Sequence, residues 1–214
     1  MIDQAQLQAH LLDAYVAGQL GSGMRLLVET QAAMRPAQDL AVADTLGGAL
    51  LERETPAAMA ADALEQVLAK IDVTAPAGGR GHGRWGAEVE KLPEPLRFRA
   101  LEELGKHGWR YAGPGVRILQ LRALGGPTTE LIRIEPGFGV PNHTHTAGEY
   151  TLVLTGAFAD ERGRYAAGDI GYADPSVTHT PRAEKGEVCY NLAVSEAPLV
   201  LTGPLGLIQR LLPN

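Results

Sequence analysis

Two histidines and a glutamate lie close together in the segment GFGVPNHTHTAGEYTLVLTG, residues 137–156. His143 and His145 are two residues apart in what is predicted to be an extended segment, so both side chains leave the same face of the strand. Glu149 follows after a short turn, and His179 in DPSVTHTP adds a third imidazole. Imidazole and carboxylate groups that converge suit a borderline divalent cation. We therefore predict a metal site made of His143, His145, Glu149 and His179.

A polar strand face is the alternative explanation of a lone His-x-His pair, and the added glutamate and third histidine argue against it. The other histidines are expected in solvated or helix-capping positions: His10, His82 and His107. Cys189 lies in the predicted strand EVCYNLAV, where a small buried hydrophobic residue is expected. The alternative for Cys189, a fifth metal ligand or a redox-sensitive thiol, stays open here.

Composition limits the classes of protein to which the chain can belong. It has 214 residues, 45% of them hydrophobic, and a net charge of -6. The acidic balance argues against direct nucleic-acid binding, and the single cysteine excludes an intramolecular disulfide. The first residues lack the pattern of a signal peptide, and no stretch approaches the roughly 20 apolar residues of a membrane span. We expect a cytoplasmic protein that does not contact the membrane.

The elements that must position these residues fall into two groups, so the predicted fold class is α+β. Residues 1–72 have apolar residues at helical spacing, and Thr55-Pro56 has the sequence of a helix start. The predicted helices cover residues 7–16, 24–34, 38–52 and 55–71. Residues 73–107 are predicted as a Gly-rich linker, concentrated in 73–87, and a short helix interrupted by prolines. Residues 108–214 alternate short apolar runs with turns, which predicts an all-β barrel with its own core.

The metal-site segment resembles the first motif of the cupin superfamily. The family pattern is matched at every position, by Gly137, His143, His145, Glu149 and Gly156. This resemblance implies a jelly-roll barrel, also called a double-stranded β-helix, with those three side chains on a metal.

The second cupin motif is matched less completely. Gly168 and His179 occupy the positions of the family's glycine and histidine ligand. Asp174, Ser176 and Ala183 stand where proline, glycine and asparagine are usual, and these departures affect turn geometry more than metal binding.

Over nearly its full length the chain resembles the ChrR-type anti-sigma factors. The resemblance rests on LLDAYVAGQL, VADTLGGALLE, GEYTLVLTGAF, YAAGDI and THTP. It implies that the N-terminal helices bind an extracytoplasmic-function sigma factor and that the cupin responds to reactive oxygen species. The alternative from the metal site is a cupin enzyme of the dioxygenase or isomerase type, and we favour the regulatory function.

One departure from that family concerns its N-terminal zinc site. The positions of the family's zinc ligands fall on Gln6, Gln31, Arg35 and Gln38, whose side chains are poor zinc ligands. We therefore expect one divalent ion per chain, in the cupin site, and no second zinc. Zinc is the favoured ion, although iron, manganese and nickel accept the same donors. A homodimer is left open.

Overall fold

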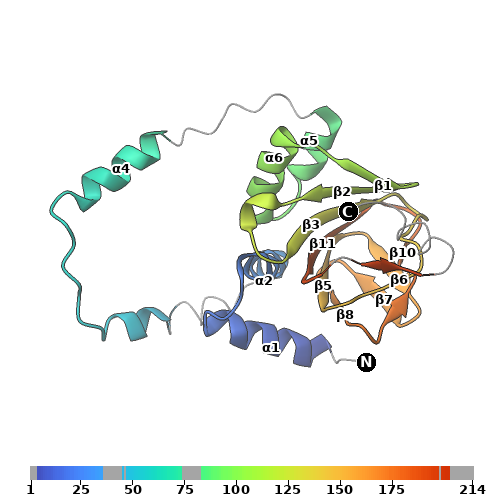
Figure 1. The fold of residues 1–214 in the computed structure, drawn as a ribbon, viewed down its shortest axis with the longest axis horizontal. Helices are drawn as coiled ribbons and strands as arrows, with labels where there is room; N and C mark the ends of the chain where they lie inside the picture. The colour runs from blue at the N-terminus through green and yellow to red at the C-terminus, as the bar shows by residue number, and fades with distance from the viewer. Residues whose placement is uncertain (1–3, 36–44, 46, 74–82, 198, 203–214) are drawn as a thin grey trace.

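The computed structural model describes residues 4–35, 45, 47–73, 83–197 and 199–202. Helices come first in the chain and antiparallel sheets follow, which confirms the predicted α+β fold with a cupin-like jelly roll (Figure 1). The helices are α1 (Gln4–Val16), α2 (Ser22–Met34), α4 (Ala63–Val73), α5 (Gly83–Val89) and α6 (Leu96–Lys106), and residues 47–51 are also helical. Residues 38–44 of the third predicted helix, with Gln38, and residues 74–82 of the predicted linker lie outside the described residues.

Two predicted boundaries are wrong. The fourth helix begins at Ala63 rather than near Thr55, and the Asp62 side chain accepts a 2.8 Å hydrogen bond from Gln66 at its start. Residues 55–60 are all exposed in the described structure, and Met59 is 84% exposed, so burial of their side chains does not offset the cost of helix nucleation. Residues 83–87, predicted as the end of the linker, are helical and belong to α5, because Val89 of the same helix is fully buried against the barrel.

The strands form one large and two small sheets, and all their pairings are antiparallel. The large sheet has the order β1 (Arg110–Gly113), β2 (Val116–Gln120), β3 (Thr128–Ile134), β11 (Cys189–Ser195), β5 (Glu149–Thr155) and β8 (Ile170–Ala173). The second has the order β10 (Arg182–Ala183), β6 (Ala157–Asp160) and β7 (Gly163–Ala166). The third has the order β12 (Val200–Leu201), β4 (His143–Thr144) and β9 (Thr178–His179).

Each face of the large sheet has its own cluster of buried residues. Cys189, Val153 and Ile134 belong to the cluster that also contains Phe158 of β6. Their neighbours in sequence point to the opposite face, because side chains alternate along a strand. There Leu131 and Leu192 belong to one cluster with residues of α1, α2, α5 and α6. The expectation of a barrel core separate from the helices is therefore wrong for α1 and α2.

Helix α2 approaches the sheet closely and is also held by polar contacts. A Cβ atom on Gly23 would lie only 2.3 Å from Oγ1 of Thr129, so the helix backbone can reach β3 only with glycine at this position. At the other end of the helix, Nε2 of Gln31 donates a buried 2.9 Å hydrogen bond to the carbonyl of Gly168. The corner between β7 and β8, residues 168–170, thus anchors α2.

Two further side chains reach the same corner. Nη2 of Arg35 lies 3.4 Å from Oδ1 of Asp169, and Nε2 of Gln4 donates to the carbonyl of Ile170 at 2.7 Å. Gln31 and Arg35 stand at two positions where the resemblance puts zinc ligands in the family, and in this chain both side chains contact the barrel instead. Here those positions join the helices to the barrel.

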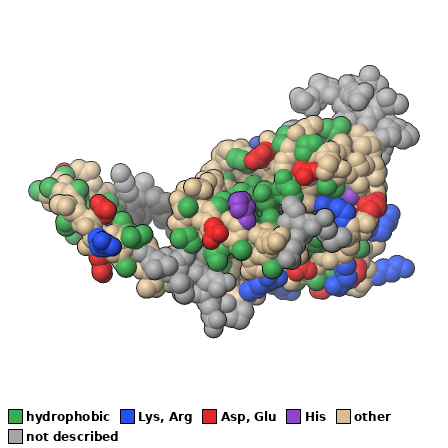
Figure 2. Space-filling view, turned by 90° about the horizontal axis from the view of Figure 1, so that it is seen from below, with side chains coloured by type: hydrophobic (Ala, Val, Ile, Leu, Met, Phe, Trp, Pro, Cys, Tyr) green, Lys and Arg blue, Asp and Glu red, His purple; other side chains and the backbone are tan. Residues whose placement is uncertain are grey.

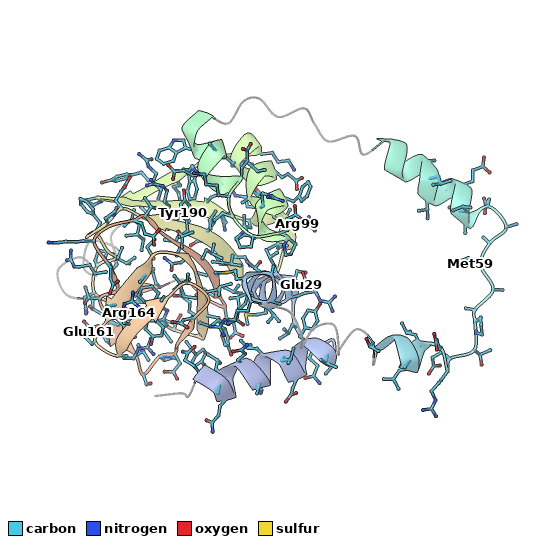
Figure 3. The ribbon with its side chains drawn as sticks, turned by 180° about the vertical axis from the view of Figure 1, so that it is seen from behind. Glu29, Met59, Arg99, Glu161, Arg164 and Tyr190 are labelled. Carbon is cyan, nitrogen blue, oxygen red and sulfur yellow. The ribbon has the colours of Figure 1, made fainter. Side chains whose placement is uncertain are left out.

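Residues 47–73, which we call the arm, lie away from the barrel (Figure 1). Large apolar side chains are exposed along it, including Leu50, Leu51, Met59, Leu64 and Leu68. Figure 2 shows hydrophobic side chains on the surface of this projecting segment, and Met59 lies far from the barrel in Figure 3. Across the described part of the chain, no helix combines the length and the apolar character that crossing a bilayer requires.

Candidate metal centre

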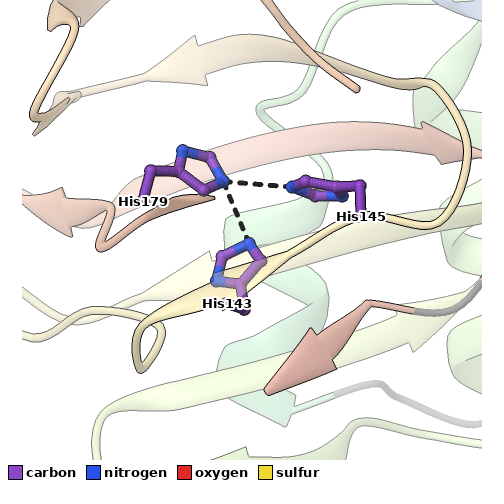
Figure 4. Close-up of side chains that lie close together, drawn as sticks. All are labelled: His143, His145 and His179. Carbon is purple, nitrogen blue, oxygen red and sulfur yellow. Dashed lines mark hydrogen bonds between the residues drawn. The ribbon is translucent and has the colours of Figure 1, made fainter. Parts of the chain in front are cut away.

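The three predicted histidine ligands meet at one point (Figure 4). His143 of β4 and His179 of β9 are directly opposite each other in the antiparallel pair, and their Nε2 atoms are 3.0 Å apart. His145 follows β4, and its Nε2 atom lies 3.1 Å from that of His179. The His-x-His spacing and the pairing of β4 with β9 therefore bring the rings together as the sequence predicted.

Burial keeps two of these rings neutral. All three histidines are at most 5% exposed. Removal from water disfavours the charged imidazolium and lowers the pKa of His143 and of His145 to about 4. At pH 7 both rings are therefore unprotonated at one nitrogen, which is the form that binds a metal ion.

The neighbours of the rings decide which nitrogen is free. Nδ1 of His143 lies 2.8 Å from the carbonyl oxygen of Pro141, which can only accept, so Nδ1 is protonated. Nδ1 of His179 lies 2.7 Å from a carboxylate oxygen of Asp160 and is protonated for the same reason. Nε2 of neutral His143 then directs a lone pair toward Nε2 of His179 across 3.0 Å. A cation between the two nitrogens would be bound by this lone pair.

The spacing of the nitrogens also fits a metal ion. Three imidazole nitrogens bound to tetrahedral zinc at about 2.0–2.1 Å lie roughly 3.3 Å from one another. The two Nε2–Nε2 distances of 3.0 and 3.1 Å are close to this value. His143, His145 and His179 could therefore hold a divalent ion with small adjustments of the rings.

Glu149, the fourth predicted ligand, lies beside this group rather than in it. Its Oε2 atom is 3.8 Å from Nδ1 of His145, whereas Nε2 is the nitrogen of that ring that faces His179. Its Oε1 atom accepts a 3.3 Å hydrogen bond from Thr151, and burial raises the pKa of the carboxyl group. The convergent set within the described residues consists of the three histidines. Glu149 would have to turn toward the Nε2 atoms to complete a four-ligand site.

Sequence reasoning missed Asp160, which contacts a candidate ligand directly. Burial alone would raise the pKa of Asp160, but hydrogen bonds from His179 and from the backbone N–H of Arg162 lower it below its ordinary value. The carboxylate is therefore ionised at pH 7. No motif marks this residue, because it lies 19 positions from His179 and in a different sheet.

Cys189 and the remaining histidines lie elsewhere. The Cys189 thiol is fully buried in the cluster with Val153 and Phe158 and is not among the converging ligand atoms. This position matches the expected buried hydrophobic residue. His107 is the C-cap of α6, as expected, His10 is exposed on α1, and His82 lies outside the described residues.

Comparison with known proteins places this geometry in a family. A family model described as the ChrR cupin-like domain matches residues 99–197. The anti-sigma-E factor ChrR of Cereibacter sphaeroides is 37% identical over 193 residues, which cover 88% of each chain. The crystal structure of Rhodobacter sphaeroides SigE in complex with the anti-sigma ChrR is similar at 35% identity and a TM-score of 0.63, covering 88% of this chain and 96% of that one. The identity and its extent show that this chain belongs to the family of ChrR-type anti-sigma factors.

Proposed function

We propose that this protein binds an extracytoplasmic-function sigma factor through its N-terminal helices and that its cupin is a metal-dependent sensor of reactive oxygen species. The proposal is supported above all by the 37% identity to ChrR of Cereibacter sphaeroides, an anti-sigma-E factor. The ChrR chain solved in complex with SigE supports the same partner class. Binding would withhold the sigma factor from RNA polymerase until the cupin responds.

The arm provides a surface of the kind that such a partner would cover. Leu64, Val67 and Leu68 are each more than half exposed. Their spacing of three and four residues puts them on one face of α4. An exposed apolar helix face fits the groove of a protein partner, where its burial stabilises the complex. We therefore propose that this face takes part in sigma binding.

Co-expression with the sigma factor of the same organism most similar to SigE tests the partner. The wild-type chain should co-purify with it at 1:1 stoichiometry and prevent its binding to core polymerase. The double substitution Leu64→Glu/Leu68→Glu should weaken the complex by about tenfold or more, since it places charges in the apolar contact. Phe98→Glu is the matched control, because Phe98 is also exposed but lies on α6 against the barrel.

Two results would contradict the proposal. Equal binding by the arm variant and the Phe98 variant would show that α4 takes no part in the contact. Absence of any complex, together with turnover of a small substrate by the Fe(II)-loaded protein, would favour the cupin enzyme instead. The buried group of three histidines is the observation that supports this alternative, a metal-dependent cupin enzyme.

The metal part of the proposal concerns His143, His145, His179 and, after a turn of its side chain, Glu149. A bound divalent ion would supply Lewis acidity, and iron or manganese would also supply redox chemistry. Zinc is the ion we favour. The protein's own contribution is a buried group of three imidazoles, of which His143 and His145 are neutral.

Elemental analysis tests this site. The wild-type protein should carry one divalent ion per chain, and His143→Ala/His145→Ala should carry none. His10→Ala, which changes an exposed histidine on α1, should retain the wild-type content. Unchanged metal content in the double variant would show that the site is wrongly assigned.

The sensing part is tested on the assembled complex. An organic hydroperoxide should release the sigma factor from the wild-type complex within the treatment time, measured by size-exclusion chromatography. The His143→Ala/His145→Ala variant should keep the sigma factor bound under the same treatment. Release at equal rates from both would separate the oxidant response from the metal centre.

A further inference from the structure

Asp160 touches the metal centre from the side that no ligand motif describes. It is the last residue of β6, and its side chain is fully buried. Its Oδ2 atom lies 2.7 Å from Nδ1 of His179. We infer that Asp160 is a positioning residue for His179 as a metal ligand. The inference rests on the proposed metal site and goes beyond it by adding a residue that does not bind the ion itself.

The carboxylate is fixed independently of His179. Its Oδ1 atom accepts hydrogen bonds from the backbone N–H groups of Arg162 at 2.9 Å and Gly163 at 3.2 Å. The Arg162 guanidinium lies 3.5 Å from Oδ2 and also donates to the carbonyl of Tyr172 at 2.6 Å. Asp160 cannot rotate without breaking the bonds of the β6–β7 turn. The turn therefore fixes the direction from which Asp160 accepts the hydrogen bond of the His179 ring.

This fixed acceptor determines what His179 can do. In the neutral ring, the form that binds a metal ion, a proton held on Nδ1 leaves the lone pair on Nε2, which faces the other two histidines at 3.0 and 3.1 Å. A carboxylate behind a ligating histidine fixes the tautomer and the ring orientation and makes the ring a stronger donor. Asp160 supplies all three effects from a strand that carries no ligand.

The three rings are supported unequally. Among the described residues, Nδ1 of His143 contacts the carbonyl of Pro141, at 2.8 Å, and no carboxylate. Within the described residues, no hydrogen-bond partner is found for Nδ1 of His145. His179, from the less completely matched motif, is thus the ring with a carboxylate within hydrogen-bond distance. We expect the departures in that motif to matter little for metal binding because Asp160 holds the ring from β6.

The test compares two full-length variants that each lose one carboxylate. Asp160→Asn keeps the size of the side chain and removes its charge. Glu184→Gln is the control, because Glu184 pairs with Arg164 at the surface of the same small sheet, and no contact with a histidine is found for it among the described residues. Figure 3 labels Arg164 in that sheet. The dissociation constant for Zn²⁺ is measured by competition with a chromophoric chelator.

Asp160→Asn should weaken zinc binding by about 10- to 100-fold, the range for lost partners of ligating histidines, and Glu184→Gln should leave it within about twofold. Equal affinity in Asp160→Asn and the wild type would overturn the inference. Failure of the wild type to bind zinc would instead overturn the proposed metal site. The two failures are therefore distinguishable.

A second measurement needs no variant and separates positioning from a purely structural role. Nitrogen-15 NMR of the metal-free wild-type protein reports which nitrogen of His179 carries the proton. A proton on Nδ1 is expected from the 2.7 Å contact with Asp160. The opposite tautomer would overturn the inference even if Asp160→Asn failed to fold, since a residue that only caps the turn would not select a tautomer.

Discussion

At the scale of single residues, the environment of Cys189 is the opposite of that of a reactive thiol. Its sulfur lies 3.5 Å from the side-chain nitrogen of Asn191, inside the apolar cluster with Val153 and Phe158. Burial raises the pKa of the thiol to about 11, because the thiolate would be charged in apolar surroundings. A response to oxidants that begins at this sulfur is therefore disfavoured.

We predict that native Cys189 resists alkylation by iodoacetamide at pH 8. With a pKa near 11 only roughly one thiol in a thousand is ionised at that pH, and the side chain is fully buried. Because the pKa is raised, the thiolate fraction should increase only as the pH approaches 11. Mass spectrometry of the alkylated protein measures the modification, with urea-unfolded protein as the reactive control. Rapid labelling of the folded chain would contradict the prediction.

The residues of the centre differ in how far sequence could predict them. His143 and His145 could be paired from their spacing, because neighbours on a strand face one way. His179 required the resemblance to cupins, since its distance from His143 depends on how β4 and β9 pair. Asp160 could not be found, because its contact depends on a turn between β6 and β7 that no residue pattern identifies. Glu149 as a ligand stays a prediction.

At the scale of elements, the side chain of Gln31 tests how firmly α2 is joined to the barrel. Changing it to alanine removes the 2.9 Å hydrogen bond to the Gly168 carbonyl and leaves that buried oxygen without this donor. We predict a loss of about 1–3 kcal/mol in the free energy of unfolding. Urea denaturation of the full chain measures it. Gln6→Ala, an exposed change in α1, should alter stability by less than about 0.5 kcal/mol. Equal stability of the two variants would show that the contact contributes little.

The positions of helices and strands in the sequence were predicted more reliably than the packing of one element against another. Helical spacing predicted α1 and α2, and apolar runs between turns predicted the main strands. The start of α4 was wrong because Thr55-Pro56 has the local chemistry of a helix start, while the described residues that follow it, 57–60, are exposed and bury no apolar face. The burial of α2 on the sheet depends on contacts such as Gly23 with Thr129, which are distant in sequence and leave no local pattern.

At the scale of the whole molecule, the arm should be the first part of the free protein to be cut by trypsin. Arg53 and Arg99 are both exposed, but Arg99 lies in α6, which packs on the barrel, as Figure 3 shows. Proteases need a segment that can leave its fold, so we predict cleavage after Arg53 well before cleavage after Arg99. Mass spectrometry of the early fragments identifies the order. Bound sigma factor should slow the cut at Arg53 selectively, and a resistant Arg53 in the free chain would contradict the prediction.

The interlocking of helices and barrel limits how the chain can be divided. Helix α2 lies on β11 and β5, and Gln4, Gln31 and Arg35 all end at residues 168–170. A truncation at the Gly-rich stretch would expose the apolar face of the sheet that α1 and α2 cover. It would also leave these two helices without the sheet against which they pack. Fragments made by such a cut would aggregate or loosen for reasons unrelated to regulation. Separation-of-function experiments should therefore use point substitutions in the intact chain.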